Sequence, residues 1–312
     1  MGHSNALGSN STGTIQFSGG ALQYSADNQV DYSARMSSAS NGTIKIDTHG
    51  QDVTLATGLS GSGVTLTKLG SGNLTLSGSN TYTGDSNINA GTLTVTGGLA
   101  DGSDVVVASG ARYAVQASDT VQSLSGAGSV ELASAVTLTT GDANHQTLLG
   151  VISGAGALSK AGSGTLTLSG ANTYSGDTQV LGGTLKMTGT LADASNVSVS
   201  SGAAYRAEAT DTIASLSGAG SVVLATGVTL TTGNAQNQTV SGVISGAGAL
   251  SKVGSGTMTL TGANTLTGAI SIEAGTLVAN HSGGQALDTA AKVQVSAGAV
   301  LNTGTPTGGT TN

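Results

Sequence analysis

Residues 160–177 read KAGSGTLTLSGANTYSGD, and this stretch occurs three times at one fixed spacing. Residues 68–85 read KLGSGNLTLSGSNTYTGD and residues 252–269 read KVGSGTMTLTGANTLTGA. The spacing is 92 residues in both cases, because 160 − 68 and 252 − 160 are equal. Self-similarity at a fixed period is the sequence signature of a repeat architecture, in which each unit packs on its neighbours.

The local pattern inside each copy predicts short β-strands. Thr165 to Leu168 alternate polar and apolar residues, which is the two-residue period of a strand with one buried face. Glycine, Ser-Gly and Ala-Asn interrupt the pattern every few residues, as expected of turns. Similar Gly-led segments begin at Gly164, Gly183, Gly202 and Gly220, at nearly constant steps. We therefore expect five turns of about 18–19 residues in each 92-residue unit and almost no helix.

These periods predict an all-β protein, a parallel β-helix (β-solenoid) with coils of about 18–19 residues grouped in 92-residue repeats. Its narrow interior is filled by aliphatic side chains, and glycine forms the corners. The expected divisions are these: 1–13, a leader or the cut edge of a longer protein; 14–67, a degenerate first half-repeat; 68–159, repeat 1; 160–251, repeat 2; 252–303, a truncated repeat 3; 304–312, a flexible tail.

Twelve positions define the core and turn of the repeat, four in each copy. They are two apolar residues of the strand, an asparagine, and a Tyr or Leu after the asparagine. They comprise Leu74, Leu76, Asn80 and Tyr82; Leu166, Leu168, Asn172 and Tyr174; and Met258, Leu260, Asn264 and Leu266. Because Tyr82 and Tyr174 are matched by Leu266, we predict apolar packing at this position rather than stacking on a sugar.

The phrase GSGTLTLSGANTYSGDTQVLGGTLKM at 162–187 resembles the autotransporter-associated β-strand repeat, also called the passenger-associated transport repeat. The segment at 19–63 resembles the stretch that often precedes such repeats in large exported bacterial proteins. The resemblance implies a right-handed parallel β-helix that forms the stalk of a bacterial surface or secreted protein, commonly an adhesin or aggregation factor. It further implies an internal fragment of the passenger of an autotransporter-like adhesin.

Composition excludes several other classes. The chain of 312 residues has 51 glycines, 2% aromatic and 8% charged residues, no cysteine and a net charge of −7. Ordinary soluble domains carry about 25% charged residues. Three arginines and six lysines are too few for a nucleic-acid surface. No apolar run approaches the ~18 residues of a membrane helix, so we expect no membrane span in this segment. The lack of cysteine excludes disulfides and cysteine-zinc sites.

We expect no catalytic, metal or cofactor-binding site. Asp104 and Asp142 are replaced by asparagine in the next copy, an exchange typical of turns. Four further aspartates persist between copies and are also expected in turns: Asp101, Asp193, Asp119 and Asp211. The GGxGxD calcium repeat is absent, and the four histidines lie far apart in the sequence.

The sequence therefore favours a non-enzymatic extracellular segment that gives reach and multivalent adhesion or cell aggregation, as in biofilms. Its hydroxyl-rich strands suit two partners, surface or matrix glycans and identical chains. Two alternatives stay open. One is a self-assembling fibre unit that stacks through the ends of the solenoid. The other is a β-helical polysaccharide-active enzyme, which would need a cluster of carboxylates and basic groups.

Overall fold

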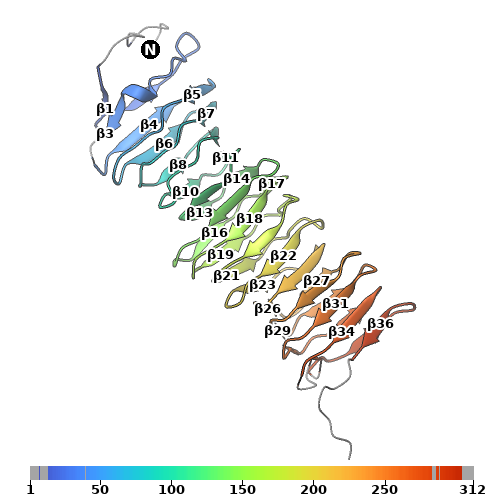
Figure 1. The fold of residues 1–312 in the computed structure, drawn as a ribbon. Helices are drawn as coiled ribbons and strands as arrows, with labels where there is room; N and C mark the ends of the chain where they lie inside the picture. The colour runs from blue at the N-terminus through green and yellow to red at the C-terminus, as the bar shows by residue number, and fades with distance from the viewer. Residues whose placement is uncertain (1–6, 8–12, 39, 283–285, 288, 304–312) are drawn as a thin grey trace, which may run out of the picture. The chain divides into compact units, whose positions relative to one another are not determined.

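The computed structural model describes residue 7 and residues 13–38, 40–282, 286–287 and 289–303 (Figure 1). Apart from Leu7 and Gly13, the expected leader at 1–13 lies outside the described residues, as does the expected tail at 304–312. The chain divides into two compact units. The first contains residues 1–142 and 146–157, and the second contains residues 143–145 and 158–312.

The first unit is built from parallel strands that stack turn upon turn (Figure 1). One sheet contains β2 (Ala21–Gln23), β4 (Thr43–Asp47), β6 (Thr65–Leu69), β8 (Ser86–Ile88), β10 (Asp104–Val107), β13 (Ser123–Gly126) and β16 (Gln146–Leu148). A second contains β5 (Val53–Leu55), β7 (Asn73–Leu76), β9 (Thr92–Val95), β11 (Arg112–Val115), β14 (Ser129–Leu132) and β17 (Ile152–Gly154). Shorter pairings join β12 (Asp119–Val121) to β15 (Thr137–Thr140) and β1 (Ile15–Phe17) to β3 (Met36–Ser38). A 3-10 turn, η1 (Ser33–Arg35), precedes β3.

The second unit has the same construction. One sheet contains β18 (Ala157–Lys160, whose first residue belongs to the first unit), β20 (Thr178–Val180), β22 (Asn196–Val199), β25 (Ser215–Gly218), β28 (Gln238–Val240), β31 (Thr257–Leu260), β34 (Thr276–Ala279) and β36 (Val300–Asn302). Another contains β19 (Thr165–Leu168), β21 (Thr184–Met187), β23 (Ala204–Ala207), β26 (Ser221–Leu224), β29 (Ile244–Gly246) and β32 (Thr265–Leu266). A third contains β24 (Asp211–Ile213), β27 (Thr229–Thr232), β30 (Ala249–Lys252), β33 (Ile270–Ile272) and β35 (Val293–Val295).

Every pairing between these strands is parallel, and no α-helix occurs among the described residues. The predicted all-β parallel solenoid is confirmed, with about 14 turns. The alternation in the sequence explains the strand faces. On β19, Leu166 and Leu168 are buried, whereas Thr165 and Thr167 are partly exposed. Each turn thus places aliphatic side chains inside and hydroxyls outside.

The turns are on average longer than the sequence predicts, and the expected five turns per repeat are wrong. In the second unit, the ladder from Leu158 leads through β20, β22, β25 and β28 to Met258 five turns later. Five turns thus advance the chain by 258 − 158 = 100 positions, which exceeds the repeat step of 252 − 160 = 92. Leu250, the repeat equivalent of Leu158, therefore lies on β30, in a different sheet.

This mismatch decides what the repeat can present to solvent. Within the second unit, β19 and β31 are equivalent in sequence but belong to different sheets. A side chain that recurs in the next copy is thereby rotated onto another face of the solenoid. Contacts along one face are made instead by residues of successive turns, which differ in sequence.

Candidate functional site

The apolar residues that define the repeat lie inside the turns. Leu74 and Leu76 of β7, Leu166 and Leu168 of β19, and Met258 and Leu260 of β31 are all at most 3% exposed. Burial of a leucine side chain contributes about 1.5–3 kcal/mol to folding. These residues form the core of the solenoid.

The three asparagines occupy buried turns and bridge successive coils. The Asn80 side-chain oxygen accepts a hydrogen bond from the Leu59 amide at 3.0 Å, and its amide nitrogen donates to the Gly98 carbonyl at 2.9 Å. The amide groups of Asn172 and Asn264 also donate to backbone carbonyls of a following turn. A buried side chain with both a donor and an acceptor satisfies backbone groups that the short strands leave unpaired.

The tyrosines of the repeat are fully buried, so they offer no ring to a ligand. The Tyr82 hydroxyl lies 2.7 Å from Ser86 Oγ, and the Tyr174 hydroxyl lies 2.6 Å from Thr178 Oγ1. Burial raises the pKa of both phenols. The third equivalent, Leu266, is 2% exposed and has no hydroxyl to satisfy. All three side chains lie in the interior of their turns.

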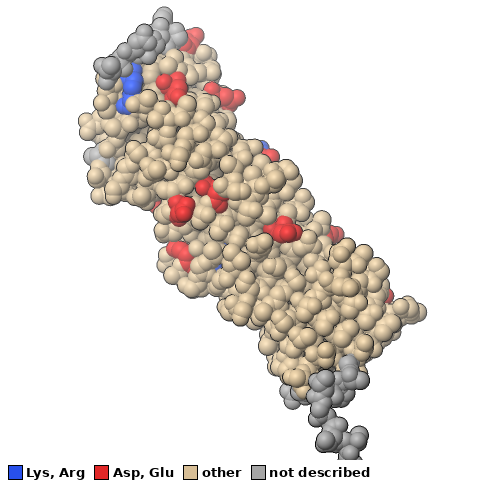
Figure 2. All heavy atoms as spheres, viewed as in Figure 1, with Lys and Arg blue, Asp and Glu red and all other residues tan. Residues whose placement is uncertain are grey.

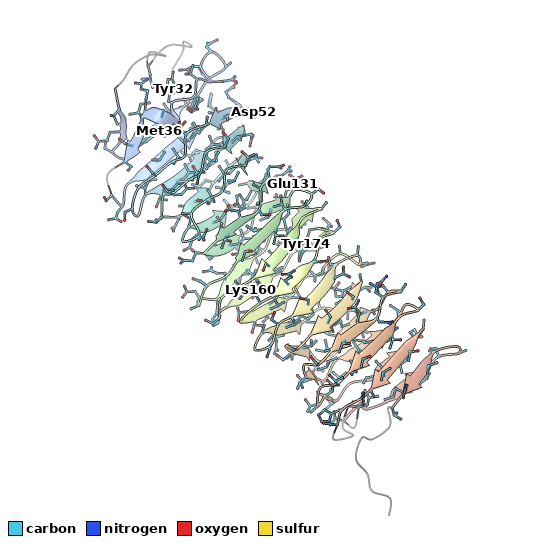
Figure 3. All side chains as sticks on the ribbon, in the orientation of Figure 1. Tyr32, Met36, Asp52, Glu131, Lys160 and Tyr174 are labelled. Atoms are coloured by element: carbon cyan, nitrogen blue, oxygen red, sulfur yellow. The ribbon has the colours of Figure 1, made fainter. Side chains whose placement is uncertain are left out.

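Three buried lysines were not predicted from the sequence. Lys68, Lys160 and Lys252 are at most 1% exposed, although lysine is almost never buried without partners. The Lys252 ammonium group donates to the carbonyls of Val253, Gly254 and Ala274 at 2.7, 2.9 and 3.0 Å. Figure 3 labels Lys160, whose ammonium group has the equivalent acceptors Ala161, Gly162 and Gly182. We call each arrangement a lysine cage.

Glycine makes the lysine cage possible. Gly70, Gly162 and Gly254 follow the three lysines and have φ of +77°, +63° and +69°. This left-handed conformation is unfavourable for residues with a Cβ atom. The turn directs the glycine carbonyl back at the ammonium group.

Burial lowers the pKa of Lys68 to about 8, and it also lowers the pKa of Lys252. The signal in the sequence was the recurrence of lysine at one position in a chain with few charges.

Of the four persistent aspartates, Asp101 and Asp193 lie in turns as predicted. The prediction is wrong for Asp119 and Asp211, which are the first residues of β12 and β24 and accept backbone hydrogen bonds there. Asp211 is 6% exposed and accepts from the Leu191 and Thr212 amides at 2.9 and 3.0 Å. Burial raises its pKa to about 6, the two amide donors oppose this shift, and the Asp193 carboxylate adds to it. Asp119, its counterpart in the first unit, accepts equivalent bonds and also has a raised pKa, chiefly through burial.

The outer surface carries few charges. On the face seen in Figure 2, acidic groups form small separate patches between neutral side chains. Within the described ranges, no three His, Asp or Glu side chains come together where they could hold a metal ion. The His145 Nδ1 atom accepts from the Thr165 amide at 3.0 Å. None of the helical structure among the described residues is long and apolar enough to cross a membrane.

Comparison with known proteins identifies the repeat. The family described as passenger-associated-transport-repeat matches residues 66–95, 158–187 and 250–279. The chain carries three passenger-associated transport repeats. No curated protein and no solved structure matches the chain.

Each matched segment covers about one and a half turns of the solenoid and includes the lysine cage. In the second copy, residues 158–187 contain Lys160, the buried pair Leu166 and Leu168, and Tyr174. A passenger-associated transport repeat is therefore a structural unit here, whose recurring side chains are mostly buried.

Proposed function

We propose that this chain is a non-enzymatic β-solenoid segment of an autotransporter-type passenger at the bacterial surface. It gives reach and multivalent adhesion or cell aggregation. The proposal rests on the different roles of the inward and outward side chains within each turn. The recurring residues are buried in structural roles, while the outer strands present hydroxyl and amide groups. Many weak polar contacts on one stiff support suit binding by avidity.

Surface display tests this proposal. The chain is fused to an outer-membrane anchor in a bacterial strain that does not aggregate, and settling and attachment to a glycan matrix are measured. We expect displaying cells to settle and attach faster than cells that display an unrelated β-solenoid of similar length. Equal behaviour of the two strains would refute an adhesive role.

A second candidate is end-to-end assembly. The strands β35 and β36 are the last in their sheets, and their Val295 and Val300 are 44% and 49% exposed. Open edges with exposed apolar side chains favour pairing with another strand. Light scattering at rising protein concentration measures this directly. Assembly that Val300→Lys abolishes would support this candidate, and a monomer at all concentrations would contradict it.

A further inference from the structure

A polar groove crosses the outer face of the second unit. It spans the neighbouring strands β20, β22, β25 and β28 and has a volume of about 320 Å³. That volume is at the lower end of the range for small-ligand sites. Its lining contains carboxylate, amide and hydroxyl side chains and no aliphatic or aromatic side chain: Asp177, Gln179, Asn196, Ser198, Ser215, Ser217, Asn234, Gln236 and Gln238.

The surface is hollow because short side chains in the middle are flanked by longer ones. Ser198 and Ser217 are ladder neighbours in the middle, and their short side chains form the floor. Gln179 pairs with Ser198 on one side, and Gln238 lies on the far strand. The turn from β25 to β28 is longer than the turn before it, as the ladder partners Gly218 and Val240 show. The longer turn includes Asn234 and Gln236, which also line the groove.

The groove contains both ordered and unused hydrogen-bonding groups. The Asn196 amide donates to Asp177 Oδ1 at 3.0 Å, and Ser215 Oγ donates to Asn196 Oδ1 at 2.7 Å. This row is held in place before any ligand arrives. By contrast, among the described residues the side chains of Gln179 and Ser217 form no hydrogen bond with the protein. They supply donors and acceptors to whatever occupies the groove.

The charge of the lining restricts the ligand. No lysine or arginine lines the groove, so it lacks the groups that bind phosphate, sulfate or carboxylate. A single carboxylate, Asp177, is too little for a divalent cation, which takes several oxygen ligands with charge. The absence of apolar lining disfavours hydrophobic ligands. A neutral ligand chain with many hydroxyl groups can both donate hydrogen bonds to the amide and hydroxyl side chains of the lining and accept hydrogen bonds from them.

We propose that this groove is a binding site for a neutral oligosaccharide. Four strands at a spacing of about 4.8 Å give a path of ~14 Å, enough for a short stretch of sugar units. Without an aromatic platform, the groove binds its ligand weakly, with a Kd in the ~mM range. The inference rests on the proposed adhesive function and names the ligand class that one part of the surface recognises.

The first unit provides a matched surface with different chemistry. Asn196 corresponds to Asp104, and the floor residue Ser198 corresponds to Val106, which is 36% exposed. The second floor residue is unchanged, because Ser217 corresponds to Ser125. An added carboxylate and an apolar floor remove two of the features that suit a neutral polyol. We therefore expect the groove of the second unit, and not its counterpart, to bind.

The test uses the full chain and linear neutral oligosaccharides of four to six glucose, mannose, galactose or N-acetylglucosamine units. Saturation-transfer NMR identifies the panel members that bind, and titration of chemical shifts gives the Kd. Ser217→Phe fills the floor of the groove, and Ser125→Phe is its matched control in the first unit. Gln179→Ala is a second groove variant at an exposed position, where folding is not at risk. Circular dichroism checks the fold of each.

We expect Ser217→Phe to raise the Kd at least ~10-fold and Gln179→Ala ~2–5-fold, with a change under ~2-fold for Ser125→Phe. Binding by no panel member, or equal loss in Ser217→Phe and Ser125→Phe, would overturn the site. The adhesion assay separates this from the proposed function. If Ser217→Phe changes neither the Kd of the purified chain nor the adhesion of displaying cells, the groove is wrong and adhesion stands. If the purified chain binds sugar at the groove but displayed cells do not adhere, the groove stands and the adhesive role falls.

Discussion

The two full repeats carry the same surface row with different charge. In the first unit, Ser123 Oγ donates to Asp104 Oδ1 at 2.7 Å. In the second, Ser215 Oγ donates to Asn196 Oδ1 at the same distance. The hydrogen bond survives the exchange because an oxygen acceptor is present in both copies. The formal charge does not survive, so the same strand pairing supports two surfaces of different charge.

The interior behaves in the opposite way. Lys68 in the first unit and Lys160 in the second keep the same buried position and donate to the same kinds of carbonyl. A substitution there would leave several acceptors without a donor in a site that water does not reach. Packing and hydrogen bonding thus fix the inside of each copy, and the outside is free to diverge. Substitutions at inward and at outward positions test this contrast.

Removal of a caged lysine should have the largest effect. Lys160→Met keeps much of the side-chain volume but leaves the carbonyls of Ala161, Gly162 and Gly182 without their donor. We expect a loss of roughly 3–6 kcal/mol in the free energy of unfolding, measured by denaturant titration. Lys186→Met is the surface control. Its ion pair with Glu208 is partly exposed, so we expect a cost below about 1 kcal/mol. Similar losses in the two variants would break the contrast.

The next largest difference in folding stability is expected between the two faces of one strand. On β19, Leu166→Ala removes a buried side chain and should cost about 2–5 kcal/mol. Thr167→Ala, one residue further on the outer face, should cost less than about 1 kcal/mol. Thermal unfolding followed by circular dichroism gives both values. Leu74→Ala repeats the test on β7 of the first unit, and a mild effect there would restrict the conclusion to the second unit.

The strand faces could be predicted from the sequence, because alternation is a local property of a few consecutive residues. Thr165 and Leu166 already show which side is buried. The number of turns could not be predicted, because it depends on how much chain each loop uses before the next ladder begins. The long turn from Gly218 to Val240 has no marker that separates it from the shorter turn before it. The sequence shows the 92-residue period of the repeat, but it does not show how many turns of the solenoid one period contains.

The residues of the candidate site likewise fall into those that could be predicted from the sequence and those that could not. Apolar residues such as Leu168 are assigned to the interior by their type, whereas Lys252 is buried against its type. Its burial requires a glycine corner and a carbonyl from the following turn, here that of Ala274. The groove likewise joins Gln179 and Gln238, which are distant in sequence and three strands apart in the sheet. Only the register of the ladder places such residues together.

A pH-dependent prediction concerns the buried Asp211. Its folded-state pKa of about 6 lies above its ordinary value of 3.8. As pH rises from about 4 to above 6, the unfolded chain releases this proton first, so folding stability contributed by Asp211 falls over that window. Asp211→Asn stays neutral and still offers an oxygen to the Leu191 amide. Relative to the parent chain, this variant should gain about 1–3 kcal/mol between about pH 4 and pH 7.5.

Denaturant titrations at both pH values measure this change, and the exposed Asp177→Asn is the control. A parallel response of the two variants would assign the pH dependence to general surface charge. A gain confined to Asp211→Asn would place it in the interior, where Asn80 and Asn172 are also buried and carry neutral side chains.

The smallest change in folding stability is expected for two buried tyrosines of the second unit. The Tyr174 hydroxyl has a partner in Thr178, whereas the Tyr205 hydroxyl is buried with no hydrogen-bond partner among the described residues. Tyr174→Phe leaves the Thr178 hydroxyl unpaired and should cost about 1 kcal/mol. Tyr205→Phe removes a desolvated group and should be neutral or stabilising by up to about 1 kcal/mol. Opposite signs would show that the interior is held by satisfied polar groups as well as by apolar volume, because the two substitutions remove the same atom.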